Sequence, residues 1–497
     1  MVEQRKRLKN RGICVIIPTF DNAGTIADVV ARTQKQCDDV IVVCDGCTDD
    51  TLLQLAALPV SPEIISFPEN RGKGAALKAG FRYALDKGFS YAITLDGDGQ
   101  HFPEDIPSML NANIRYPGAL ILGRRKGLEN IERSAGSRFA NSFSNFWFAL
   151  QTGHYLKDTQ TGYRLYPLKK LYGLSLLTSR YEAELELPVF ASWHGVKLVS
   201  EPVNVYYPSP EERVTHFRPV RDFSRIFVLN TILCILAVVY GLPLTILRGV
   251  DTIVRSLFFG LSFIFFSLCV MTPFAWLYIG LGRKTEKKVM NLHRMIHYYA
   301  KFAINHIPGV KYTCSDPSGE SFDVPAVVIC NHQSHLDLLA LLSLTPKLVI
   351  LTNDWVWKDP FYGYVIRNTG FLPVSSGLDA IMPKLEKLVG EGYSIAVYPE
   401  GTRSADGRIG RFHQGAFHIA GALGLDMIPA IIYGASRALP KRRNILHRWP
   451  VYFEIGERLS PADIGSSGDT LKQQASAMRD NYRRRYSEIA DKIERDV

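Results

Sequence analysis

The first hundred residues alternate between short apolar runs and segments with the spacing of an amphipathic helix. The apolar, β-rich runs, each predicted to be a strand, occupy residues 13–20, 40–46, 63–67 and 91–99. The segments between them, each predicted to be a helix, occupy residues 22–35, 49–57 and 73–87. Because strands that alternate with helices form mostly parallel sheets, we predict an α/β domain with its ligands at the carboxyl ends of the strands.

Carboxylate and amide side chains follow two of these strands. The second strand ends in Asp45, and the fourth runs into Asp96, Asp98 and Gln100 on a glycine-rich turn. Since parallel strands end at one edge of a sheet, we expect these groups to share that edge. Two carboxylates one residue apart can hold one hard divalent cation, while a diphosphate fills its other positions. A solvated acidic turn is the alternative.

Two apolar stretches without charge follow this domain, at residues 226–247 and 256–282. Each exceeds the roughly 20 residues that cross a bilayer. Basic residues lie on both outer flanks, and the connector 248–255 is short, so two crossings or one re-entrant hairpin would leave both flanks in the cytoplasm. A buried core helix is the alternative for either stretch. The predicted division is therefore residues 1–225, a membrane segment 226–282, and a second domain 283–497.

The second domain contains a candidate acid–base pair. A short apolar strand at residues 327–330 runs into NHQSHLD, which places His332 five residues before Asp337. On a loop that enters a helix, this spacing lets the carboxylate hold one ring nitrogen and orient the other toward a hydroxyl. His335 competes for the same role.

A second motif supports this pair. SIAVYPEGTRS (394–404) predicts a strand that ends in a turn. A glycine turn with a hydroxyl and a guanidinium is a suitable phosphate cradle. The residues of this turn are Glu400, Gly401, Thr402 and Arg403.

Five motifs stand in order along the first 220 residues. They are PTFDN (18–22), VVCDGCTDDT (42–51), ENRGKGAALKAG (69–80), DGDGQHFPED (96–105) and DTQTGYR (158–164). This part of the chain resembles the family-2 glycosyltransferases of the GT-A fold, in the branch that includes polyprenyl-phosphate sugar synthases. The resemblance implies a nucleotide-sugar donor and a Mg²⁺ or Mn²⁺ cofactor. The metal ligands it implies are Asp96, Asp98 and Gln100, with Asp98 first among them.

The same resemblance assigns residues to the substrates. Those implied to bind donor or acceptor are Pro18, Asp45, Asp96, Arg124, Arg133 and Arg164. The three arginines would face phosphates, in agreement with the bidentate fit of guanidinium to phosphate, although surface arginines are the alternative. An inverting transfer needs a base for the acceptor proton, and Glu184 and Glu186 are the candidates. A phosphate acceptor needs no base, and both glutamates are equally compatible with a helix surface.

The C-terminal motifs, together with MIPAII (427–432), resemble the glycerolipid acyltransferase family over about residues 320–460. The resemblance implies that His332 is the general base on an acceptor hydroxyl, which attacks an acyl thioester of coenzyme A or acyl carrier protein. Asp337 would orient the imidazole, and the turn at residues 400–403 would bind the acceptor. No cofactor is expected here. The family's usual arginine is missing from GFLPVSSG (370–377), which suggests an acceptor other than a simple lysophosphatidic acid.

The front domain also departs from its family. Relatives often have an Asp-Asp-Gly-Ser turn, whereas this chain has CDGC, with Cys44 and Cys47 in place of an acid and a serine. No second cysteine pair accompanies them, so we expect two small thiols rather than a zinc site. The eight cysteines are scattered and form no disulfide framework, which favours a reducing compartment.

The whole sequence predicts a bifunctional enzyme of bacterial lipid or glycolipid biosynthesis. Lys+Arg 58 against Asp+Glu 48 gives a net charge of +10, which suits phosphorylated substrates and an anionic membrane surface. The expected partners are a nucleotide-sugar, an acyl thioester, a lipid acceptor and the membrane, with no nucleic acid. We expect the cytoplasmic membrane, with both domains facing the cytoplasm. The alternatives are a polyprenyl-phosphate sugar synthase with an independent acyltransferase, and a membrane scaffold with one inactive domain.

Overall fold

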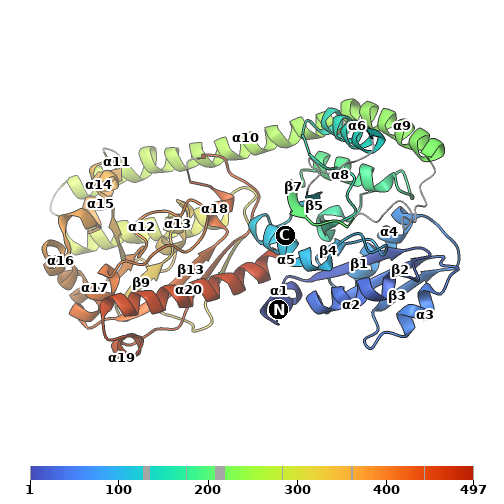
Figure 1. The fold of residues 1–497 in the computed structure, drawn as a ribbon. Coiled ribbons are helices and arrows are strands. Elements are labelled where there is room, and N and C mark those ends of the chain that lie inside the picture. The colour runs from blue at the N-terminus through green and yellow to red at the C-terminus, as the bar shows by residue number, and fades with distance from the viewer. Residues whose placement is uncertain are drawn as a thin grey trace. The chain divides into compact units, whose positions relative to one another are not determined.

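The chain divides into two compact units, residues 1–248 with 491–497 and residues 249–490 (Figure 1). The structure is a computed structural model that describes residues 2–126, 135–174, 176–206, 219–281, 284–359, 362–441 and 443–495. Each unit contains a seven-stranded, mostly parallel sheet with helices packed on it. The predicted α/β fold class is confirmed for both.

The sheet of unit 1 has the order β3-β2-β1-β4-β6-β5-β7, and only β6 runs antiparallel to its neighbours. The strands β1 to β4 therefore end at one edge, as the alternating pattern predicts. The fourth strand stops at Thr94 rather than at residue 99, so its acidic turn lies entirely beyond the sheet. The strands are β1 (Ile13–Thr19), β2 (Val40–Asp45), β3 (Glu63–Phe67), β4 (Tyr91–Thr94), β5 (Leu120–Arg125), β6 (Arg164–Pro167) and β7 (Leu198–Val203).

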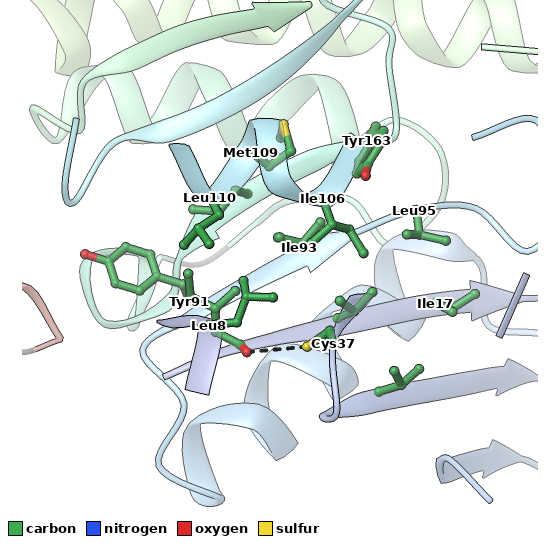
Figure 2. Close-up of a cluster of buried hydrophobic side chains, with 14 of the residues drawn as sticks. Leu8, Ile17, Cys37, Tyr91, Ile93, Leu95, Ile106, Met109, Leu110 and Tyr163 are labelled. Carbon is green, nitrogen blue, oxygen red and sulfur yellow. Dashed lines mark hydrogen bonds between the residues drawn. The ribbon is translucent and has the colours of Figure 1, made fainter. Parts of the chain in front are cut away.

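Helices cover both faces of this sheet. Alternate residues of β1 point to opposite faces, so Ile13, Val15 and Ile17 pack with α2 and α5, in the cluster shown in Figure 2. Cys14 and Ile16 pack on the other face with α4 and α8. The helices are α1 (Val2–Asn10), α2 (Ile26–Gln36), α3 (Thr51–Ala56), α4 (Lys73–Asp86), η1 (Pro103–Asp105), α5 (Ile106–Arg115), α6 (Ala135–Thr152), α7 (Leu168–Leu171) and α8 (Ala183–Trp193).

A buried ion-pair cluster joins the two ends of the chain inside unit 1. Arg11 is 0% exposed and donates to Asp491 at 2.9 Å, to Glu494 and to Asn113 at 2.8 Å. The Tyr91 hydroxyl donates to the carbonyl of Glu494 at 2.9 Å. Since a buried guanidinium needs opposite charge to offset its lost hydration, the last helical turn is an integral part of unit 1.

The two apolar stretches form one helix, which corrects the prediction of two crossings or a hairpin. A single apolar helix covers Ser224–Gly280, 57 residues, and the predicted connector 248–255 is helical. Pro243 and Pro273 each follow a π-helical turn that accommodates the proline without reversing the chain. The segments are α9 (Pro219–Leu236), η2 (Ala237–Gly241), α10 (Leu242–Phe265), η3 (Phe266–Met271) and α11 (Thr272–Gly280).

The sheet of unit 2 has the order β11-β10-β12-β9-β13-β14-β8. Its central strand β9 is completely buried between parallel neighbours β12 and β13, while β14 runs antiparallel to β13. Its carboxyl end therefore opens at the edge where β12 also ends. The strands are β8 (Tyr312–Ser315), β9 (Ala326–Cys330), β10 (Leu348–Thr352), β11 (Leu372–Pro373), β12 (Ser394–Val397), β13 (Asp426–Tyr433) and β14 (Val451–Ile455).

The last helix of the chain packs on this sheet with one face. The Tyr482 hydroxyl is buried and joins Ile329 to Ala430, with hydrogen bonds of 2.7 and 3.0 Å. The helices are α12 (Glu286–Asn305), α13 (Leu336–Leu342), α14 (Asp354–Lys358), α15 (Tyr362–Asn368), η4 (Val374–Ser376), α16 (Leu378–Gly390), α17 (Gly415–Leu423), α18 (Ala435–Ala438), α19 (Pro461–Ser466) and α20 (Leu471–Glu494).

We predict that Arg11→Ala destabilises unit 1 by about 3–5 kcal/mol, because it leaves two buried carboxylates without a counter-charge. Arg5→Ala in the preceding helix α1 is the matched control, since Arg5 and Asp38 form an exposed pair and such pairs contribute only about 0–1 kcal/mol. Denaturant unfolding of the full chain measures both. Equal midpoints for the two variants would show that the buried cluster does not hold unit 1 together.

Candidate active sites

The first site lies at the carboxyl edge of β1, β2 and β4, and Asp45 fixes its loop. Its carboxylate is 3% exposed and accepts from the amides of Arg71 and Gly72, both at 2.8 Å. Gly46 follows with φ +72°, where a Cβ would lie 2.4 Å from the Asn70 nitrogen. Asp45 thus holds the segment before α4 against β2. Pro18 lies buried within β1.

A lysine bridges two carboxylates at this edge. The Lys73 ammonium, in the first turn of α4, lies 2.6 Å from Asp96 and 3.0 Å from Glu184 of α8. Burial works against its charge, but the two carboxylates raise the pKa of Lys73 well above its usual range. Lys73 has no role among the residues predicted from the sequence, and its place in the ENRGKG motif is the signal that could have identified it.

Asp98 is the carboxylate of the predicted metal pair that remains open. Its Oδ1 accepts from the amide of Gln100 at 3.0 Å, and within the described residues no protein donor reaches Oδ2. Burial and the charge of Asp96 raise the pKa of Asp98, a repulsion that a cation would relieve. Burial has the same tendency at Asp96, but Lys73 and His101 outweigh it and lower the pKa of Asp96.

These oxygen donors fit a hard divalent cation at the site. Asp98 supplies an open carboxylate oxygen, and Gln100 lies two residues along the same turn, partly exposed. The Asp96 carboxylate already forms an ion pair with Lys73, so it is less available to a cation than Asp98. In the described part of the chain no group of three or more histidine, cysteine or acidic residues forms a metal cluster, so a bound cation would depend on substrate phosphates for its remaining ligands.

The predicted phosphate-binding arginines have different surroundings. Arg164 is 0% exposed and donates to the carbonyls of Thr159, Thr161 and Glu184, so it braces a loop and does not face a phosphate. The prediction that Arg164 faces a phosphate is therefore corrected. Buried carbonyls need hydrogen-bond donors, and the Arg164 guanidinium supplies them. Arg124, at the end of β5, is half-buried. Arg133 lies outside the described residues.

The two candidate bases are not brought together. Glu186 is 0% exposed, and its carboxylate accepts from the amides of Leu177 and Thr178 and from the Thr178 hydroxyl. It therefore holds the segment before α8 and is closed to an acceptor, which corrects the prediction for Glu186. Glu184 remains at the site edge, paired with Lys73.

The CDGC turn places two thiols beside this edge. Cys44 is buried in β2, and the Sγ of Cys47 lies 3.6 Å from the carbonyl of Thr19. The Cys44 thiol donates to the sulfur of Cys47 and lowers the pKa of Cys47 to about 7. A partly exposed thiol with a lowered pKa ionises more readily than an ordinary cysteine and is the better nucleophile near neutral pH.

The second site, in unit 2, is centred on His332 at the end of β9. Its Nδ1 lies 2.9 Å from Oδ2 of Asp337, and its ring stacks on Tyr398 with centroids 4.0 Å apart. Asp337 is 0% exposed and also accepts from the amides of Gln333 and Ser334. With Nδ1 bound to a carboxylate, Nε2 is the nitrogen left for a hydroxyl.

His335 does not share this arrangement. His335 directly precedes α13 and is exposed to solvent. Within the described residues it makes no hydrogen bond to Asp337. The structure thus separates the two histidines that spacing alone left open, in favour of His332.

Glu400 connects the SIAVYPEGTRS segment (394–404) to the His332 loop through hydrogen bonds. Its Oε1 accepts from the amide of His332 at 2.9 Å and its Oε2 from the amide of Gly410 at 2.7 Å. Burial raises the pKa of Glu400, while these two amides oppose that shift. With both oxygens engaged and 8% exposure, Glu400 positions the His332 loop rather than contacting an acceptor.

The remainder of this turn is open to solvent. Gly401 has φ +68°, Thr402 is exposed and Arg403 is half-buried. The Lys441 ammonium donates to the Arg403 carbonyl at 2.6 Å and to the Thr402 hydroxyl at 3.4 Å. Lys441 therefore adds a cation beside the predicted acceptor site that the motif did not indicate.

We predict that Cys47 is alkylated by iodoacetamide with half-maximal rate near pH 7, because the hydrogen bond from Cys44 stabilises its thiolate. Cys44→Ala removes that donor and should slow Cys47 alkylation at pH 7 by about tenfold. Peptide mass spectrometry measures the modification, with the exposed Cys269 as internal reference. Alkylation of Cys47 that begins only above pH 8 in the wild type would contradict the assignment.

Comparison with known proteins finds similarities for both domains. Family models match at residues 14–164 for glycosyl transferase family 2 and at residues 310–433 for the acyltransferase family. The chain is 30% identical over 204 residues to polyprenol monophosphomannose synthase of Mycolicibacterium smegmatis, covering 38% of this chain and 75% of that one.

The C-terminal half has its own relatives. It is 31% identical over 233 residues to the chloroplastic 1-acyl-sn-glycerol-3-phosphate acyltransferase LPAT1 of Arabidopsis thaliana, covering 44% of this chain and 62% of that relative's length. Among solved structures, the 1-acyl-sn-glycerophosphate acyltransferase PlsC of Thermotoga maritima is similar, with 23% identity, a TM-score of 0.41, and coverage of 48% of this chain and 98% of that chain. The chain therefore belongs to glycosyl transferase family 2 through its N-terminal domain, and its residues 310–433 match the acyltransferase family model.

Proposed function

We propose that the chain is a bifunctional enzyme of bacterial lipid or glycolipid biosynthesis. One unit transfers a sugar from a nucleotide-sugar to a lipid-linked acceptor, and the other transfers an acyl group from acyl-CoA or acyl carrier protein to a hydroxyl of the same pathway. The observation that carries this proposal is that one chain contains two separately constructed centres, the open Asp98 carboxylate beside Asp96 and Lys73, and the His332–Asp337 pair.

In the sugar transfer, the acceptor oxygen attacks the anomeric carbon from the face opposite the leaving nucleoside diphosphate, which inverts that centre. Mg²⁺ or Mn²⁺ held by Asp98 would supply positive charge to the departing diphosphate. Lys73 offsets part of the negative charge of Asp96 and Glu184, so these carboxylates repel the donor less. A phosphate acceptor is already an anion and needs no base, which agrees with the ion-paired state of Glu184.

In the acyl transfer, Nε2 of His332 takes the proton of the acceptor hydroxyl as its oxygen attacks the thioester carbonyl. The thiolate then leaves and takes up the proton, which restores neutral His332. Asp337 holds the imidazole by Nδ1 and stabilises its protonated form. Thr402, Arg403 and Lys441 lie where an anionic acceptor group would be recognised.

The long helix supports a membrane location without a crossing. At 1.5 Å per residue its 57 residues span about 85 Å, far more than the roughly 30 Å hydrocarbon core. With successive residues placed about 100° apart, the exposed apolar side chains of α10 fall within an arc of about 160°, in the pattern of an interfacial helix. They are Leu242, Ile246, Leu247, Val250, Ile253, Val254, Leu257, Phe258, Leu261, Ile264 and Phe265.

The charged residues of α10 fall on the other side of the helix. Arg255 pairs with Asp251 at 2.9 Å, and Arg248 donates to Thr245 at 3.2 Å. We therefore propose that the helix lies in the plane of the cytoplasmic membrane surface with this apolar stripe in the lipid. A helix that does not cross leaves both flanking domains in the cytoplasm.

We predict that single substitutions separate the two activities. Asp98→Ala should lower sugar transfer by at least about a hundredfold and leave acyl transfer unchanged, while His332→Ala should do the reverse. Purified full chain is assayed for nucleoside diphosphate release and for free thiol release. His335→Ala is the matched control for His332→Ala and should retain acyl transfer. An activity that survives its own substitution would indicate an inactive or wrongly assigned centre, as the scaffold alternative requires.

We predict that Leu257→Glu with Leu261→Glu lowers binding to anionic lipid vesicles by about tenfold or more, because two apolar anchors are replaced by charges. Ser262→Glu is the matched control, since Ser262 is exposed on the opposite side of the same helix. Vesicle flotation measures the bound fraction. Equal loss in both variants would contradict an interfacial stripe, and resistance of the wild type to alkaline extraction would indicate a crossing.

A further inference from the structure

Unit 2 contains a basic pocket whose lining residues have no part in the two reactions as described above. Its volume is about 390 Å³. The loop before α17 forms one wall and one face of α20 forms the other. The polar residues that line this basic pocket are Arg411, His413, Gln414, Lys472, Ser476 and Arg479.

Positive charge in the basic pocket is largely uncompensated. Arg411, His413 and Lys472 are exposed, and none has an ion-pair partner within the described part of the chain. Arg479 donates to Asp480 at 2.8 Å and to the hydroxyl of Ser476 at 3.1 Å. No carboxylate is among the lining residues. Cations that converge on one concavity without acids select an anionic ligand.

The start of α17 adds to this preference. The nine-residue helix begins at Gly415, and its N-cap Gln414, which lines the basic pocket, makes no capping hydrogen bond through its side chain. Backbone amides and the helix dipole at such a terminus favour negative charge, and arginine binds phosphate oxygens in a bidentate fashion. The side chains and the helix terminus therefore select the same ligand chemistry, a phosphate ester.

The basic pocket adjoins the acyl-transfer centre through direct contacts. The amide of His413 donates to the carbonyl of Pro399 at 2.7 Å, and a Cβ on Gly401 would lie 3.6 Å from the His413 ring. Between Pro399 and Gly401, Glu400 accepts from the amides of both Gly410 and His332. The wall of the basic pocket is thus in direct contact with the turn that positions His332.

We propose that the basic pocket binds the phosphate-bearing end of a substrate of the acyl transfer. Phosphate esters occur at the nucleotide end of an acyl-CoA thioester and in the headgroup of a phosphorylated lipid acceptor, and both present the same chemistry to Arg411, Lys472 and Arg479. The assignment to acyl transfer rests on the proposed function of unit 2, whereas phosphate binding itself does not.

The first experiment measures binding alone. Full-length protein is titrated calorimetrically with inorganic pyrophosphate and with coenzyme A, as wild type and as Arg411→Gln with Lys472→Gln. The double variant should bind at least one of these probes at least tenfold more weakly. Arg484→Gln is the matched control, since Arg484 is an exposed arginine of α20 outside the pocket, and should bind within twofold of wild type. Wild-type binding of neither probe, or equal binding by the double variant, overturns the proposal.

The second experiment distinguishes the two sources. The KM for acyl-CoA is compared with that for an acyl thioester of N-acetylcysteamine, which lacks the nucleotide, and the KM for a phosphorylated acceptor with that for its dephosphorylated form. A rise confined to acyl-CoA in the double variant places the donor in the basic pocket, and a rise confined to the phosphorylated acceptor places the acceptor there. If neither KM moves, the pocket is not a substrate site. If no thioester is turned over at all, the proposed acyl transfer fails, while pyrophosphate binding still reports on the pocket.

Discussion

Buried carboxylates that accept backbone amides hold both centres in place. Asp45 binds the amides of Arg71 and Gly72, and Glu400 binds those of His332 and Gly410. A carboxylate removed from water must regain hydrogen bonds, so each one fixes a loop that is distant in sequence. His332 stands on a loop held in this way, and Lys73, which pairs with Asp96, directly follows the segment that Asp45 holds. Their geometry therefore depends on residues that touch no substrate.

The element pattern of the sequence was a good guide to the sheets and a poor guide to what each polar residue does. The strand at residues 40–45 follows from its apolar run, because a buried parallel strand requires continuous apolar side chains. The strand at residues 63–67 lies at the edge of the sheet and is largely exposed. The His332–Asp337 spacing also predicted a contact that the structure shows. By contrast, Arg164 and Glu186 lie in motifs beside the site but are buried on backbone groups. A polar residue in a motif can bind a ligand or hold a loop through backbone groups. The motif alone cannot distinguish these two roles, because both require hydrogen-bond donors and acceptors.

Long-range features were invisible for a different reason. Arg11 and Asp491 are 480 positions apart, so no local pattern indicates their pairing. The composition of the apolar stretches at 226–247 and 256–282 predicts segments compatible with lipid, but it does not indicate whether the chain reverses between them. The helical path through residues 248–255 depends on α10 continuing past charged residues that face away from the apolar stripe.

The fusion gives the account its central claim, that sugar and acyl transfer converge on one lipid. The most direct test is mass spectrometry of total lipids from cells that express wild type, Asp98→Ala or His332→Ala, grown with isotopically labelled sugar and fatty acid. Wild-type cells should contain one new lipid that carries both labels, and one of the variants should accumulate a singly labelled precursor of that lipid. Two unrelated singly labelled lipids, or identical lipid profiles in all three strains with both substrates present, would contradict the claim.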